Sequence, residues 1–417
     1  MTWSKLILAV FAVTFALATV AFAGSGDRIY GKITTVDGDV FEGLIRWDKN
    51  EGNWVDVLNG NKELSKRNLR KSGKSGRKKY RDRDVSINIL GLKVGGRSNN
   101  WTVWTSEAQS GMRFGHIKML EVVGDDEVVV VLKSGEEVEL SGGSTDIGDG
   151  IREIVIEDER EGEIELVWDD IEMVEFLDTP GDLKSNLGDR LFGTLTTRRG
   201  DEYTGYVCWD VDELFTSDIL DGDHKGRRRK IKFGKIDTIS RYSSSGAEVI
   251  FTNGDEMVLR GTNDVDDSNS GITISDPGFG QVTVKWDEFD NLKFHDPTLS
   301  VRYSDFDGGR LLGGTVFTED GDSYTGSIRW DNDEEYTWEI LDGEFRDMEF
   351  DVEFGLIKSI EKKSYRAVTV TVWDGRSFAL RGSNDVNEDN KGIFITMSDG
   401  DEVEVDWDEF ERVEFKK

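Results

Sequence analysis

The chain repeats itself three times, and this internal repeat constrains its fold more than any other feature. Residues 30–48, 192–210 and 313–331 share a pattern that ends in Trp-Asp, and their glycines stay in register. A second block, 249–261 (VIFTNGDEMVLRG), recurs as 370–382 (VTVWDGRSFALRG) at a gapless offset of 121 residues. Self-similarity of this kind is typical of a chain built from tandem structural units.

The repeat predicts three units after the N-terminal segment, 27–180, 189–297 and 309–417. We call these ranges unit 1, unit 2 and unit 3. Unit 1 is longer than the others because it carries an insertion at about 61–113, rich in basic residues. The linkers between the units are short and polar, so we expect the units to lie near one another.

Alternation of apolar and polar residues indicates β-strands. In residues 203–209, Tyr203, Gly205, Val207 and Trp209 share one parity, and Thr204, Tyr206 and Cys208 share the other. A period of two is typical of half-buried antiparallel strands, and helical periodicity is absent after residue 23. The glycine inside this strand recurs in each unit and predicts a bulge or bend. The predicted fold class is therefore all-β.

Each unit also divides into two halves that end in Trp-Asp and a short strand, as in 284–294 (VKWDEFDNLKF) and 405–415 (VDWDEFERVEF). The order of strand, glycine turn, bent strand and short closing strand resembles SH3-like and Sm-like small barrels, which secreted bacterial proteins often string together. The resemblance covers most of the chain. It implies three tandem repeats of two small antiparallel barrels each, and it carries no catalytic residues across.

Residues 1–23 are predicted to be a secretory signal peptide. Lys5 supplies the positive start, the stretch 6–22 is almost all apolar, and Ala21-Phe22-Ala23 has the small residues that signal peptidase recognises. The alternative is a membrane anchor of nearly spanning length. No later segment could span a bilayer, so we expect an exported protein, periplasmic or extracellular, with no transmembrane segment in the mature chain.

Composition disfavours several classes of function. The chain holds 84 Asp plus Glu against 52 Lys plus Arg, a net charge of -32, and such a field repels nucleic acid. A single cysteine excludes a disulfide framework. The three histidines do not occupy matching positions of the repeat, and no nucleophile elbow or phosphate loop is present. We therefore expect a protein that is not an enzyme.

Tryptophans are the first candidates for a binding surface. Those at the ends of the half-units share parity with apolar residues, which favours the core over sugar stacking: they are Trp47, Trp168, Trp209, Trp286, Trp330 and Trp407. Trp54, Trp101, Trp104 and Trp338 lie outside this pattern and are predicted to be exposed, which would suit a carbohydrate-binding protein.

Two acidic loops are candidates for calcium. Asp264 and Asp266 alternate in NDVDDSN (263–269), and Asp385, Asn387 and Asp389 alternate in NDVNEDN (384–390). Oxygen ligands at alternate positions of a turn suit Ca²⁺, although the glycine and the final glutamate of an EF-hand are missing. The alternative is a pair of Asx-rich turns that cap their own backbone.

A basic stretch and a lone cysteine complete the candidates. The stretch from Lys62 to Asp84 holds 11 Lys or Arg, and it suits an arm for anionic partners, a lid over the acidic body, or a solvated loop. Cys208 is predicted to point outward by parity, where a thiol can pair between chains.

These features together predict an exported non-catalytic repeat protein that acts as a binding or structural module in the cell envelope or outside the cell, with an unknown protein or glycan as partner. The first alternative is a calcium-stabilised, adhesin-like envelope protein. The second is a carbohydrate-binding protein.

Overall fold

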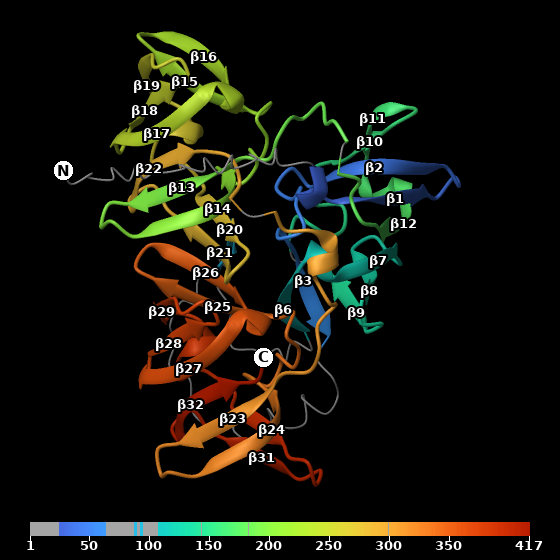
Figure 1. Cartoon of the computed structure of the whole chain (residues 1–417), viewed down its shortest axis with the longest axis vertical. Coiled ribbons are helices and arrows are strands. Elements are labelled where there is room, and N and C mark those ends of the chain that lie inside the picture. Colours follow the sequence, from blue (N-terminus) through green and yellow to red (C-terminus); the bar gives the residue numbers. More distant parts are fainter. Residues whose placement is uncertain are drawn as a thin grey trace, which may run out of the picture.

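The part of the chain that the structure describes is antiparallel β-structure. A computed structural model gives residues 25–63, 87–89, 92–94, 107–142, 144–181, 183–298 and 300–417. Nearly all strands of these residues belong to three large sheets (Figure 1). This confirms the all-β class. The predicted signal peptide, Trp101, Trp104 and the basic stretch beyond Glu63 lie outside the described residues.

The first sheet belongs to unit 1. Its ten strands lie in the order β11 (Gly162–Leu166), β10 (Ile154–Asp158), β2 (Val40–Trp47), β1 (Tyr30–Thr35), β12 (Ile171–Phe176), β7 (Ile117–Val122), β8 (Glu127–Leu132), β9 (Glu137–Ser141), β3 (Val57–Glu63) and β6 (Glu107–Arg113). A separate two-stranded sheet pairs β4 (Ile87–Ile89) with β5 (Leu92–Val94).

The second sheet joins unit 2 to a hairpin of unit 3. Its twelve strands lie in the order β16 (Arg227–Lys232), β15 (Ile219–His224), β19 (Glu256–Arg260), β18 (Gly246–Phe251), β17 (Ile236–Ser243), β22 (Phe289–Phe294), β13 (Phe192–Thr197), β14 (Glu202–Trp209), β20 (Ile272–Asp276), β21 (Gly280–Val284), β26 (Met348–Glu353) and β25 (Ile340–Phe345).

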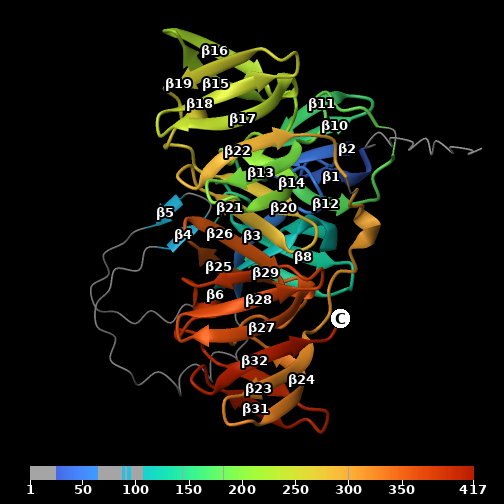
Figure 2. The same cartoon turned by 60° about the vertical axis from the view of Figure 1, so that its left-hand side comes forward.

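The third sheet holds the rest of unit 3. Its eight strands lie in the order β29 (Ser377–Leu380), β28 (Ala367–Val372), β27 (Ile357–Ser364), β32 (Phe410–Phe415), β23 (Gly313–Thr318), β24 (Ser323–Arg329), β30 (Ile393–Thr396) and β31 (Glu402–Val405). The second and third sheets follow one another along the long axis of the molecule, and unit 1 lies beside them (Figures 1 and 2).

Helix is confined to short turns in the described residues. They are the 3₁₀ turns η1 (Ser25–Asp27), η2 (Phe114–His116), η3 (Trp168–Asp170), η4 (Phe233–Lys235), η5 (Asn263–Val265), η6 (Tyr303–Asp305), η7 (Phe354–Leu356) and η8 (Asn384–Val386). None of these turns has the length and apolar character that a membrane-crossing helix needs.

The small closed barrels are not found, because no sheet of the described residues closes on itself. The first and last strands of each sheet instead have one edge that pairs with no described strand of the same sheet. In the second sheet, strands of two units pair with each other. The edge of β21 pairs with β26, from Gly280 opposite Val352 to Val284 opposite Met348. A strand that pairs with a neighbouring unit cannot also close its own sheet.

The hydrophobic core of the described residues consists of two large clusters, and their extent agrees with the pairing of β21 and β26 between units 2 and 3. One cluster of buried apolar side chains runs through units 2 and 3 together, and a second fills unit 1 and takes in Tyr303, Phe306 and Trp338 from the chain that follows unit 2. The six tryptophans at the half-unit ends are all buried. Their burial agrees with the parity of the strands, because side chains of one parity face the same side of a sheet.

The recurring strand glycine serves a close approach between backbones. A Cβ at Gly43, Gly205 or Gly326 would lie 2.0, 2.4 or 2.2 Å from a carbonyl oxygen of the neighbouring strand. The pairing of these strands at the glycine shows no register shift in β1–β2, β13–β14 or β23–β24, so the predicted bulge is not the reason for the glycine.

We expect Gly326→Ala to destabilise the protein by about 1–3 kcal/mol, because the added methyl group must push β24 away from β30. Gly313→Ala on the paired strand is the matched control, since its Cβ would have no atom nearer than 3.8 Å. Chemical denaturation of both variants measures the difference. Equal stability of the two variants would contradict the explanation by close approach.

Candidate functional site

A tryptophan and an aspartate form the same clamp in each unit. The indole Nε1 of Trp47, Trp209 and Trp330 donates to the backbone oxygen of Asp146, Asp264 and Asp385, at 2.9, 2.9 and 3.0 Å. The carboxylate of each aspartate accepts a backbone N–H from a nearby strand: Asn59 at 2.8 Å, Asp221 at 2.5 Å and Asp342 at 2.8 Å. The clamp therefore ties the loop to the strands β3, β15 and β25.

The residues predicted to bind calcium take part in this loop structure. Asp264 and Asp385 are buried in the clamps. Asp266 and Asn387 accept the backbone N–H two residues ahead, from Ser268 at 2.9 Å and from Asp389 at 2.7 Å, as Asx turns do.

In the described ranges, no group of three or more His, Cys, Asp or Glu side chains is arranged to hold a metal ion. Calcium binding by the two loops stays a prediction from sequence.

Two tryptophans predicted to be exposed are buried. Trp54 is 0% and Trp338 is 1% exposed, and both pack with Tyr303 or Tyr336. Each lies in the loop before a hairpin, and that loop packs against another part of the chain. The prediction of an exposed aromatic surface at Trp54 and Trp338 is therefore wrong.

An acidic side chain directly before each hairpin organises the junctions between units. Asp56 precedes β3, Asp218 precedes β15 and Glu339 precedes β25, and each carboxylate accepts backbone N–H groups of its own loop. A cation from another unit completes each site: Arg190 bonds to Asp56 at 3.2 Å, Arg46 bonds to Asp218 at 3.1 Å, and Lys62 pairs with Glu339.

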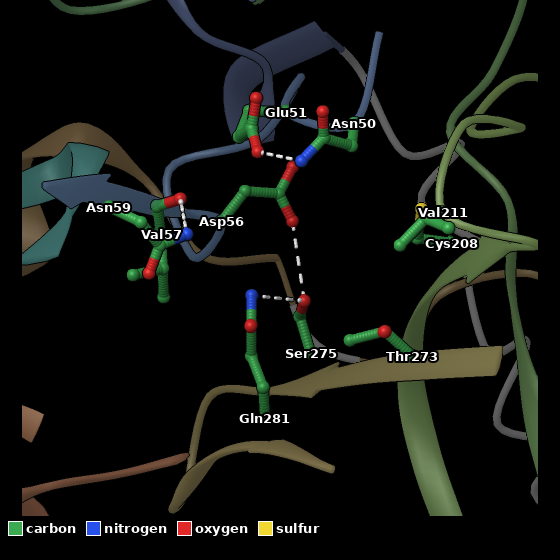
Figure 3. A pocket seen from close by; sticks show the side chains of 10 residues that line it. All are labelled: Asn50, Glu51, Asp56, Val57, Asn59, Cys208, Val211, Thr273, Ser275 and Gln281. Atoms are coloured by element: carbon green, nitrogen blue, oxygen red, sulfur yellow. Dashed lines mark hydrogen bonds between the residues drawn. The ribbon is translucent and has the colours of Figure 1, made fainter. Parts of the chain in front are cut away.

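The junction between units 1 and 2 contains a small polar cavity (Figure 3). Asp56 projects into it, and the Ser275 hydroxyl donates to Asp56 at 3.3 Å while the Gln281 amide donates to Ser275 at 3.1 Å. Its volume of about 20 Å³ leaves room for a water molecule and no larger ligand. The cavity is therefore a structural joint.

The same junction corrects the placement of Cys208. The thiol is 6% exposed and packs with Leu214 and Phe215, so it does not point into solvent. Burial raises the pKa of the Cys208 thiol well above its ordinary value. Arg46 and Arg329, which share its strand position, are buried as well. The residues alternate along the strand as predicted, but other parts of the chain cover the face that Cys208 shares with these arginines.

A larger groove lies where the three units meet. It has a volume of about 370 Å³ and is lined by parts of β6, β21, the hairpin β25–β26 and the loop 382–389. We call it the acidic groove, because its lining includes Asp342, Glu344, Glu349, Asp351 and Asp389. Amides and hydroxyls make up most of the remaining polar lining, and no Lys or Arg of the described residues lines it.

Two carboxylates of the acidic groove face each other. Asp342 and Asp351 are paired residues of β25 and β26. Burial, followed by the charges of Asp342 and Glu349, raises the pKa of Asp351 well above its ordinary value. Burial likewise raises the pKa of Asp342 to about 6. Both carboxyls are therefore protonated more readily than an ordinary aspartate, and a bound cation could take the place of a proton between them.

Sequence reasoning missed this groove. The only groove residues it selected are Asn387 and Asp389, as calcium ligands. The apolar–polar pattern predicts no strands over 340–353, although the acids at 342 and 344 and at 349 and 351 alternate. That alternation was the available signal. The convergence of three units at one place could not be read from it.

Comparison with known proteins identifies no relative of this chain. The chain was compared with models of protein families, with curated proteins and with solved structures, and none matches. The acidic groove is therefore defined by its own residues, and its lining suits a positively charged ligand more than an anion.

We expect the free energy of unfolding to rise as the pH falls from about 8 to about 5. Burial raises the pKa of Asp146 to about 7 and that of Asp264 to about 6, whereas in the unfolded chain both stay near their ordinary value. The folded state therefore binds more protons in this window, and stability falls as pH increases through these pKa values.

Asp264→Asn should flatten this dependence, because its amide can still accept the Asp221 N–H but does not ionise. Asp158→Asn is the control, since three backbone N–H groups hold the pKa of Asp158 at about 2 despite its burial. Denaturant unfolding at constant ionic strength measures both. A pH profile of Asp264→Asn that matches the unmodified protein would refute the assignment.

We expect Arg190→Met to destabilise the protein by about 3–5 kcal/mol, because it leaves Asp56 buried without its cation. The two side chains are 2% and 3% exposed. Arg199→Met is the matched control: Arg199 pairs with Glu288 at 3.2 Å but is 55% exposed, and such pairs contribute about 0–1 kcal/mol. Losses of equal size would show that burial of the junction pair does not matter.

Proposed function

We propose that the protein is an exported, non-catalytic binding protein that holds a positively charged segment of a protein partner in the acidic groove. It would act in the cell envelope or outside the cell. The observation that carries this proposal is the lining of the groove, where five carboxylates from unit 3 lie together without a lining Lys or Arg in the described residues.

The electrostatics of the groove support a cationic partner. Lys285 already pairs with Glu349 at 3.4 Å at the edge of the groove, which shows that a basic side chain fits beside these acids. Burial raises the pKa of Glu349 as well, so the groove is a place where negative charge is costly. A bound Lys or Arg lowers this cost, and the net charge of -32 attracts basic partners over a distance.

Export and the repeat organisation complete the proposal. The features of residues 1–23 support export, and the common Trp–Asp clamp supports three tandem copies of one β-unit with open sheets. In this proposal the repeat is the means of building the groove, because the groove needs β6 of unit 1, β21 of unit 2 and β25–β26 of unit 3 at one place.

The test is a calorimetric titration of the mature full chain with a short oligolysine peptide. We expect Asp342→Asn/Glu349→Gln/Asp351→Asn to weaken binding by about tenfold or more, since each lost charge contact contributes of the order of 0.5–1 kcal/mol. We expect affinity for the unmodified protein to rise with pH through about 6, as Asp342 loses its proton.

The control variant removes the same number of charges elsewhere. Glu121→Gln/Glu172→Gln/Glu175→Gln changes three exposed acids of β7 and β12. Its affinity should stay within about twofold, because only the long-range attraction changes. Equal losses in the two variants would mean that the peptide binds the acidic surface in general, and the groove would then have no special role.

A further inference from the structure

Two strand edges with opposite charge remain open in the described part of the molecule. The strand β16 pairs only with β15, and β11 pairs only with β10, so each has one edge without a neighbouring strand. All five basic side chains of β16, at 227, 228, 229, 230 and 232, are exposed together, in a chain whose net charge is -32. The edge strand β11 carries Glu163 and Glu165, and both are exposed.

The molecule already contains a strand pair of the kind these two edges could make. In the second sheet, β21 and β26 pair edge to edge between units 2 and 3. The hairpin β10–β11 of unit 1 corresponds to the hairpin β20–β21 of unit 2. In the first hairpin Asp158 lies opposite Gly162, and in the second Asp276 lies opposite Gly280.

The hairpin β15–β16 of unit 2 corresponds in the same way to the hairpin β25–β26 of unit 3. Asp221 lies opposite Lys230 in the first, and Asp342 lies opposite Asp351 in the second. The two open edges therefore correspond to the two halves of an existing interface.

A glycine makes the β21 edge accessible, and β11 has the same glycine. A Cβ at Gly280 would lie 1.9 Å from the carbonyl oxygen of Asp351 on β26, so only glycine permits this approach. Gly162 occupies that place in β11, and a Cβ there would have no atom within 4 Å. The open strand β31 instead has Asp401 at this place, before Glu402, which pairs with Arg329 at 3.9 Å.

The register of β21–β26, transferred to β11 and β16, places opposite charges face to face. In that register Gln281 lies opposite Asp351, and Thr283 lies opposite Glu349. The corresponding pairs are Glu163 with Lys230 and Glu165 with Arg228. Directly opposed charges of unlike sign stabilise an antiparallel pair, and charges of like sign destabilise it.

A third contact joins residues that are not directly opposed in the ladder. The rings of Phe279 and Phe350 lie 6.3 Å apart at the β21–β26 interface. The corresponding residues are Glu161 and Arg229, again an acid and a base. Arg228 bonds to Asp221 of its own hairpin at 3.1 Å with half of its side chain exposed, so it can reach a second carboxylate.

We propose that the β16 edge of one copy of this chain pairs, antiparallel, with the β11 edge of a second copy. Like charges disfavour β16 with β16 and β11 with β11, so the contact is head-to-tail and can continue from copy to copy. It is intermolecular, because β16 and β11 lie far apart within one copy (Figure 1). The pairing is an addition of one strand to the edge of another sheet, and it is independent of the acidic groove.

The test is an exchange of charge between the two edges, followed by sedimentation velocity of the mature full chain at low salt. The unmodified protein should associate as its concentration rises, and high salt should reverse this. Arg228→Glu/Lys230→Glu and Glu163→Lys/Glu165→Lys should each be monomeric, because the directly opposed side chains at 163 and 230, and at 165 and 228, then carry the same sign. An equimolar mixture should associate again, since every β16 finds a β11 of opposite sign.

The matched control is Asp401→Lys/Glu404→Lys at β31, which makes the same change of charge at two exposed acids of the other acidic edge and should associate as the unmodified protein does. Thermal unfolding of all variants checks that they fold. A monomeric unmodified protein at low salt, or a mixture that stays monomeric, would overturn the proposal. Loss of association in the β31 control alone would assign the contact to β31 and overturn the role of β11.

Discussion

Buried ion pairs that cross from one unit to another are the interactions on which the arrangement of the molecule depends. Asp56 and Asp218 each bind the amides of their own loop, and each receives an arginine from the other unit, Arg190 and Arg46. Asp56 is buried and would be unstable without its cation, because burial of an unpaired charge costs several kcal/mol, and Asp218 is largely covered as well. Each unit therefore completes the loop of its neighbour, and the two lock reciprocally.

Ion pairs of the same kind join unit 1 to unit 3 and hold the walls of the acidic groove in place. Lys62 of unit 1 pairs with Glu339, the residue that begins the hairpin β25–β26, and Arg113 bonds to Glu353 at 3.2 Å at the end of that hairpin. These contacts fix the hairpin between unit 1 and β21. The acids of the hairpin, Asp342 among them, are then held together by structure that the ion pairs of other residues stabilise.

The sequence predicted the parts of this fold that follow from local pattern. Period-two alternation identified the strands, and parity identified core residues such as Trp47 and Trp209. It could not predict that Arg46 and Cys208, on the outer face, would be covered by a second unit. It also missed the hairpin β15–β16, because Arg-Arg-Arg-Lys at 227–230 shows no alternation of apolar and polar residues. The groove and the open sheets depend on contacts between units, which no local pattern contains.

In the proposed contact, a glycine helps to decide which sheet edge can accept another strand. The edge of β21 carries Gly280 and is paired, whereas a side chain there would meet the facing carbonyl. Charge alone would make β11 and β31 equivalent, since both are acidic edges. In the register of β21–β26, backbone access would separate them, because Gly162 has no side chain and Asp401 would place a Cβ where one at Gly280 would meet the facing carbonyl. The charge of the edge then determines whether an acidic or a basic strand can pair with it. Steric access and charge together therefore restrict the possible strand pairs more than either one does alone.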